Sequence, residues 1–175
     1  MSTLSLVPLK NILPIDPLDT THDIRLGQLL TLAEESLSAP NGMTRFIIGT
    51  SRITYYPKVP YSPTTNVEIK IEYTPITTID KVYYISDSNQ EVDIPHTLEY
   101  RGEDTTVNIA SIPSALIDGT KNLPILINLT GGLTEDTIQP KLRFIAYQLA
   151  AIKFFNPDPT KQEIPSFLMN EINRL

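Results

Sequence analysis

The stretch between residues 20 and 38 repeats apolar side chains at the three- and four-residue spacing of an amphipathic helix. Thr20 and Thr21 are suited to cap its start, and Asp23 would lie in the first turn, where a carboxylate interacts well with unpaired N–H groups. The run Ala-Pro-Asn-Gly at 39–42 ends the pattern. The positions expected to face the core are Ile24, Leu29, Leu30, Ala33 and Leu37.

A longer helical pattern occupies the last quarter of the chain. Thr137 is the expected cap, Pro140 suits the first turn, and the run Asn-Pro-Asp-Pro at 156–159 ends the helix. Its broad apolar face, expected to be core, consists of Leu142, Ile145, Ala146, Leu149, Ala150, Ile152 and Phe155. A short third helix is predicted to open at Pro165 and to end with the chain.

Between these helices the spacing changes to the two-residue alternation of β-strands. The clearest strand is 67–73, where Val, Ile, Ile and Tyr alternate with Glu, Lys and Glu. An earlier run at 46–55 also indicates a strand, and a proline-rich turn at 57–63 separates the two. We therefore predict a long β-hairpin over 45–73.

A second, smaller β section follows the long hairpin. A strand at 79–85, a turn-forming cluster at 86–90 and a strand at 91–94 indicate a short-turned hairpin. A further strand is expected around 107–109, and a buried one at 125–129, which two glycines end. The order of elements predicts an α+β fold: an N-terminal helix, a long β-hairpin, a small antiparallel β section, and a long C-terminal helix followed by a short terminal helix.

The first 18 residues carry Pro8, Pro14 and Pro17, a spacing that fits neither a helix nor a central strand. We expect an extended arm that lies either on its own domain or on a neighbouring subunit. The predicted organisation is an arm at 1–18, one main domain at 19–160 and a C-terminal docking segment at 161–175.

Composition removes several classes of function. The 175 residues contain no Cys, which excludes a disulfide framework, a thiolate zinc site and a cysteine nucleophile. The net charge of −6 argues against a protein that binds nucleic acid by coating phosphates. No apolar stretch approaches the length needed to span a bilayer, so no membrane partner is expected.

The candidate chemistry is sparse. Asp16, Asp19, His22 and Asp23 form the densest polar cluster, and a cation or general-acid site is conceivable there, but carboxylates at a helix start are far more often caps. No nucleophile elbow, metalloprotease motif, nucleotide loop or calcium loop is present. We therefore expect neither an enzyme nor a cofactor, and look to the arm, the hairpin and the C-terminal helix as interaction surfaces.

The order of segments resembles the head–tail connector (adaptor) family of tailed bacteriophages. The resemblance rests on a helix followed by a corner, an extended hairpin, a proline-led strand ending in two tyrosines, a Tyr-containing strand, a strand ending in Gly-Gly, and a long Ala- and Leu-rich helix. The corresponding segments are 41–45 (Asn-Gly-Met-Thr-Arg), 75–84 (Pro-Ile-Thr-Thr-Ile-Asp-Lys-Val-Tyr-Tyr), 98–100 (Leu-Glu-Tyr), 125–132 and 138–151.

The resemblance implies a structural virion protein of the neck, assembled in the cytoplasm of the host bacterium. Copies would form a ring, most often a dodecamer, beneath the portal protein, and would hand the DNA channel on to a tail-completion or tail protein. DNA would pass without sequence-specific binding. No catalytic, metal or cofactor residues are implied.

Two sets of contact residues follow from the same resemblance. The C-terminal segment would dock on the portal through Pro165, Phe167, Leu168, Ile172 and Leu175. The hairpin would contact neighbouring subunits or the tail side through Arg45, Arg52, Tyr55, Tyr56, Lys58, Tyr61, Val67, Ile69, Ile71 and Tyr73.

Two other classes remain open from the residues alone. The first is a β-rich accessory module that binds a carbohydrate or a receptor, against which the absence of Trp counts, because such modules expose aromatic platforms. The second is a small hydrolase, which would need an acid/base pair that the sequence does not display.

Overall fold

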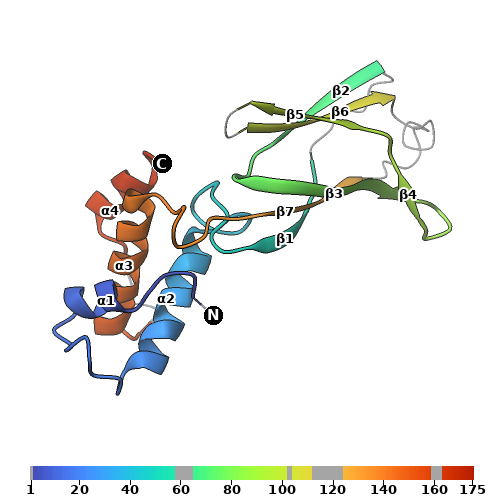
Figure 1. Cartoon of the computed structure of the whole chain (residues 1–175). Coiled ribbons are helices and arrows are strands. Elements are labelled where there is room, and N and C mark those ends of the chain that lie inside the picture. Colours follow the sequence, from blue (N-terminus) through green and yellow to red (C-terminus); the bar gives the residue numbers. More distant parts are fainter. Residues whose placement is uncertain (1, 58–64, 102–103, 112–123, 159–162) are drawn as a thin grey trace. The chain divides into compact units, whose positions relative to one another are not determined.

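The structure is a computed structural model that describes residues 2–57, 65–101, 104–111, 124–158 and 163–175. The chain divides into two compact units (Figure 1). A helical unit combines Met1–Gly49 with Leu133–Leu175, and a β unit consists of Thr50–Gly132. The fold is α+β, as the sequence predicts, with helices and antiparallel sheets in separate units.

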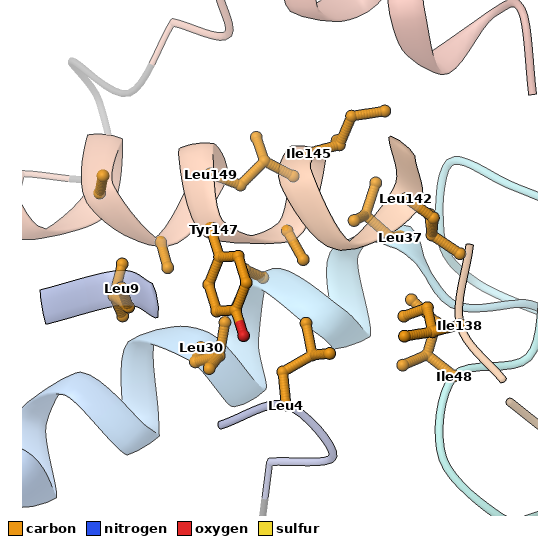
Figure 2. Packing of buried hydrophobic residues seen from close by; sticks show 14 of the residues in the cluster. Leu4, Leu9, Leu30, Leu37, Ile48, Ile138, Leu142, Ile145, Tyr147 and Leu149 are labelled. Carbon is orange, nitrogen blue, oxygen red and sulfur yellow. The ribbon is translucent and has the colours of Figure 1, made fainter. Parts of the chain in front are cut away.

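The helical unit contains α1 (Val7–Ile12), α2 (Asp23–Leu37), α3 (Pro140–Phe155) and α4 (Ser166–Ile172). Its core lies between α2 and α3, and Figure 2 shows Leu30 and Leu37 meeting side chains of α3 there. Leu142, Ile145 and Ala150 are fully buried in this core. Burial of one Leu or Ile side chain stabilises by about 1.5–3 kcal/mol, so this interface is a large contribution to the unit's stability.

The N-terminal segment is helical where an extended arm was expected. Pro8 occupies the first turn of α1, where its missing N–H leaves no bond unmade, and Pro14 follows the residue that ends the helix. Leu4 and Leu9 are buried in the core cluster of the helical unit (Figure 2), and so is Leu13. The segment therefore lies on its own chain.

The β unit contains two antiparallel sheets. β1 (Ser51–Tyr55), β7 (Ile125–Gly131), β3 (Ile76–Ile85) and β4 (Glu91–Asp93) form one, in that order. β2 (Thr65–Ile71), β6 (Asp104–Ser111) and β5 (Thr97–Arg101) form the other. The short-turned β3–β4 hairpin and the buried strand β7 confirm the sequence predictions.

The predicted long hairpin over 45–73 is wrong. β1 pairs with β7, with Tyr55 opposite Ile127, whereas β2 pairs with β6, with Val67 opposite Ile109. The reason is burial: β7 is buried along nearly its whole length and takes β1 and β3 as its two neighbours. The intervening 58–64, which include Lys58 and Tyr61, lie outside the described residues.

The helix caps also differ from expectation. His22 and Gln139 occupy the cap positions of α2 and α3, and neither side chain bonds to the helix. Asp19 accepts the N–H of Thr21 instead, and the hydroxyl of Thr137 accepts the N–H of Thr134. The side chains of Asp19 and Thr137 thus fix the turn that precedes each helix, but neither caps the helix itself.

Candidate interaction surfaces

The C-terminal helix α4 is held against the start of α3. Leu168 and Ile172 are buried in the helical core. Lys141 Nζ lies 3.1 Å from Glu171 Oε2, and the hydrogen bond from Lys141 is the main reason that the pKa of Glu171 is below its ordinary value. Arg174 adds a second ion pair at 3.2 Å from the same carboxylate. α4 is thereby an integral part of the helical unit.

The packing of α4 on the core buries some of the five residues expected to dock on a portal and leaves others exposed. Leu168 and Ile172 are occupied by the chain's own core, while Pro165 and Leu175 are partly buried. Phe167 alone of the five is exposed, with 56% of its surface open. A docking role therefore depends chiefly on Phe167, because the buried pair is unavailable to a partner.

The residues expected on a long hairpin also divide into buried and exposed ones. Val67, Ile69 and Ile71 alternate along β2 as its buried face, and their partner strand contributes Val107 and Ile109. These side chains build the β unit, because each is less than a tenth exposed.

Two tyrosines from the same predicted set pack on each other. The rings of Tyr55 and Tyr73 meet edge to face, with centroids 5.3 Å apart. Burial, with a smaller contribution from Glu72, raises the pKa of both phenols. Tyr55 is buried, whereas the adjacent Tyr56 is 62% exposed and open to a partner.

The arginines of the set belong to different units. Arg45 lies in the helical unit, where its guanidinium is 5.8 Å from the ring centroid of Phe46. Arg52 is on β1 and lies 3.5 Å from the carboxylate of Asp80 on β3. The predicted contact set is thus dispersed rather than gathered in one arm.

Polar side chains cross three strands of the larger sheet. Asp80 accepts hydroxyl hydrogen bonds from Thr130 on β7 and from Thr78, at 2.8 and 2.9 Å. The hydroxyl of Thr54 on β1 donates to Asn128 at 2.9 Å. This face is exposed and polar, suited to contacts that need no apolar burial.

The N-terminal segment is anchored by three side chains of its own unit. The carboxylate of Glu34 on α2 accepts the N–H groups of Thr3 and Leu4. Glu135 accepts the N–H of Ser5 at 2.9 Å, and the hydroxyl of Tyr147 donates to the carbonyl of Ser5 at 3.0 Å. The N–H and carbonyl groups of this segment therefore have hydrogen-bond partners within the chain and need none from a neighbouring subunit.

The polar cluster at the start of α2 is structural. Asp23 pairs with Lys10, Asp19 accepts the N–H of Thr21, and Asp16 accepts the N–H of Leu18. Within the described residues no group of three or more His, Asp and Glu side chains could hold a metal ion.

A hollow of about 380 Å³ lies beside the smaller sheet, between the start of β2 and the start of β5. His96 is part of its wall, and its Nδ1 is 2.9 Å from the carbonyl oxygen of Ile94. Among the described residues that line it there is no Phe or Tyr ring on which a sugar could stack. None of the helices in the described part of the chain has the length and apolarity to cross a membrane.

The helix periodicity misplaced two apolar residues. Ile24 and Phe155 were expected on core faces, but they are 82% and 61% exposed. Phe144 and Leu32, which were not singled out, are 50% and 48% exposed. The sequence signal for such residues is a large apolar side chain that falls outside the buried side of its helix. Because these side chains are exposed, they are candidates for contact with a partner protein.

No protein-family model matches the sequence, and no curated protein matches it. Solved structures do. A chain in the neck of an empty gene transfer agent (GTA) particle, computed with C6 symmetry, superposes with a TM-score of 0.67 and 15% identity, over 98% of this chain and 88% of that one.

Two further structures give the same result. A chain in the neck of a native GTA particle, computed with C12 symmetry, matches with a TM-score of 0.65 and 14% identity, over 98% of this chain and 87% of that one. A chain of the virion of a native GTA particle matches with a TM-score of 0.64 and 15% identity, over 98% and 88%. The predicted resemblance to neck connector proteins is thus confirmed at the level of the fold.

Proposed function

We propose that this chain is a structural protein of the neck of a phage-like virion, where copies form a ring beneath the portal, join the head to the tail and continue the DNA channel. The observation that carries the proposal is the extent of the structural match. Both the helical unit and the β unit are included in an alignment that covers 98% of the chain.

The ring is supported by the symmetry of the matched particles. Necks computed with C6 and C12 symmetry contain chains of this fold. A closed ring of identical chains needs two different surfaces on each chain, because each copy contacts one neighbour with each surface. We propose twelve copies, the number implied by C12 symmetry.

For portal docking, the exposed ring of Phe167 on α4 is the proposed anchor. Aromatic side chains commonly dominate the binding energy of an interface when they enter a partner's pocket. The Lys141–Glu171 and Arg174–Glu171 ion pairs hold the helix that presents this ring. The net charge of −6 is compatible with a channel along which DNA slides without adhering.

Mass photometry of the purified chain, alone and with the portal protein of the same genome, tests the proposal. A species near twelve times the chain mass of 19.6 kDa, alone or on the portal, is expected. A chain that stays monomeric in both conditions would overturn the ring. If a ring forms on the portal, cryo-electron microscopy of the mixture would locate its tail-side face.

Portal docking has its own test. Phe167→Asp is expected to abolish co-migration with portal while leaving the melting temperature unchanged, because the side chain is exposed. Tyr100→Asp, a change of similar character at a 54% exposed site on β5, is the matched control. Deletion of 165–175 is a poorer test, since it removes Leu168 and Ile172 from the core.

A further inference from the structure

The outward face of α2 carries two exposed apolar residues in line with two polar ones. Ile24, Gln28, Leu32 and Glu35 follow one another at spacings of four, four and three residues, which places them on one side of a helix. Ile24 is 82% and Leu32 is 48% exposed. We call these four residues the α2 stripe. The buried residues of α2, such as Leu26 and Leu30, lie on its other side.

The outward face of α3 repeats the same spacing. Phe144, Gln148, Ile152 and Phe155 also follow one another at four, four and three residues, and we call them the α3 stripe. The two phenylalanines are 50% and 61% exposed. They are separated by eleven residues, or about 16 Å of helix. Solvated helix positions are normally polar, so two large exposed aromatic rings on one helix face indicate a partner.

The two stripes are separate surfaces of the helical unit. α2 and α3 pack against each other, and contacts of His22 and Arg25 with Phe154 mark their interface at one end. The α2 stripe lies on the opposite arc of its helix from the buried residues. On α3 the rings of Phe144 and Phe155 are exposed, while Ile152 is partly buried and packs against the core. Each copy therefore presents exposed apolar side chains on both helices: Ile24 and Leu32 on α2, and Phe144 and Phe155 on α3.

Charged residues near the ends of the two stripes favour one relative direction of the helices. The α2 stripe ends in Glu35, which makes no ion pair among the described residues. The α3 stripe begins one turn after Lys141, whose side chain is 36% exposed and whose ammonium group is held by Glu171. An antiparallel arrangement of the two stripes brings Glu35 toward Lys141 and Ile24 toward Phe155. A parallel arrangement would place the carboxylate beside Phe155.

We propose that the α2 stripe of one copy packs antiparallel on the α3 stripe of the next copy, and that this is the head-to-tail contact of the ring. The inference rests on the proposed function and gives it a contact surface. A second copy is the proposed occupant because the stripes match in length and spacing, and because Glu35 of one copy would approach Lys141, which precedes the α3 stripe of the next copy. The contact is heterologous, so it can close into a ring rather than stop at a dimer.

Disulfide trapping tests the contact directly, because the chain has no Cys of its own. The double variant Leu32→Cys with Gln148→Cys places one thiol at the middle of each stripe. Oxidation is expected to yield a ladder of covalent oligomers on a non-reducing gel, in the presence of portal if portal is needed for assembly. Each single variant should give no ladder. A dimer from either single variant would indicate a self-complementary contact and would overturn the proposal.

Substitution tests the same contact without a covalent link. Ile24→Asp is expected to raise the concentration needed for assembly by at least about tenfold, because an exposed apolar side chain loses its burial. An acidic residue in the first turn of α2 suits the helix dipole, so folding should be unaffected. Phe144→Asp should have a similar effect, and Tyr100→Asp on the β unit should have none.

The outcomes separate this inference from the proposed function. If the wild-type chain forms rings but the double variant gives no ladder and both Asp variants assemble normally, the stripe contact is wrong and the ring stands. If the double variant gives a ladder but no ring forms under any condition, the contact stands and the neck assignment falls. Absence of both ring and ladder contradicts both.

Discussion

The ammonium group of Lys10 lies 2.6 Å from the carboxylate of Asp23, and the lysine side chain is only 4% exposed. The same nitrogen donates to the carbonyl oxygens of Pro17 and Asp19, at 3.2 and 2.7 Å. One buried cation therefore fixes the loop between α1 and α2 and holds α1 against the core. A buried ammonium is tolerated only where oxygen atoms replace its water, as they do here.

Lys10→Met is expected to destabilise the helical unit by about 2–3 kcal/mol, because the two carbonyls and Asp23 lose their shared partner. Urea unfolding followed by the helical circular dichroism signal measures the change. Lys70→Met is the matched control: its ion pair with Asp104 at 2.8 Å is exposed, so its loss should cost under about 1 kcal/mol. Equal stability of the two variants would contradict the role given to Lys10.

Glu34→Gln is expected to loosen the N-terminal segment and to cost about 1–3 kcal/mol, since an amide offers one acceptor where the carboxylate offers two. Glu34 accepts the N–H groups of Thr3 and Leu4 and the hydroxyl of Ser2. Hydrogen exchange of residues 2–6 should accelerate in this variant. Glu35→Gln is the control, because it makes the same change at the adjacent, exposed side chain. Exchange of residues 2–6 should be faster in Glu34→Gln than in Glu35→Gln, and equal rates would contradict the role given to Glu34.

The elements that the sequence predicts well are those set by neighbouring residues. The β3–β4 hairpin follows from the turn cluster at 86–90, in which Asn89 adopts a positive φ of 59° that asparagine tolerates. α3 follows from its long apolar repeat and from Pro140 in its first turn. Such features need no information about distant segments.

Strand pairing and surface position depend on distant segments, and they could not be predicted. β1 pairs with β7, more than seventy residues away in sequence, because the fully buried Ile127 and Leu129 need strands on both sides. Likewise, α3 has apolar residues around most of its circumference, so the repeat alone does not reveal that Phe155 faces outward while Leu142 is buried. The exposed members of that face are the candidate contact residues.

Two glycines of the chain should respond in opposite directions to alanine. A Cβ at Gly131 would collide with the backbone carbonyl of Pro75, so Gly131→Ala is expected to destabilise the β unit by about 3 kcal/mol. A Cβ at Gly27, inside α2, meets no atom within 4 Å, so Gly27→Ala should stabilise the helical unit by about 0.5–1 kcal/mol. Thermal unfolding of both variants checks the pair, and the same sign for both would contradict the packing described for them.

The carboxylate of Asp80 should make the β unit sensitive to acid. The hydroxyl of Thr130, then that of Thr78, and more weakly the charge of Arg52 hold the pKa of Asp80 below its ordinary value of 3.8. Because the pKa of Asp80 is lower in the folded chain than in the unfolded one, its contribution to stability is complete above the unfolded-state pKa. That contribution disappears as the pH falls through the folded-state pKa.

Titration of the Asp80 carboxyl carbon by NMR measures this shift, and the midpoint should lie below 3.8. Thr130→Val removes the strongest donor to Asp80 and should move the midpoint upward, while making stability less dependent on pH in the acid range. Thr54→Val is the control, because that hydroxyl donates to Asn128 on the same sheet and not to a carboxylate. If Thr130→Val leaves the midpoint in place, the hydroxyl is not the cause of the low pKa. The acid sensitivity of the sheet must then come from its other carboxylates.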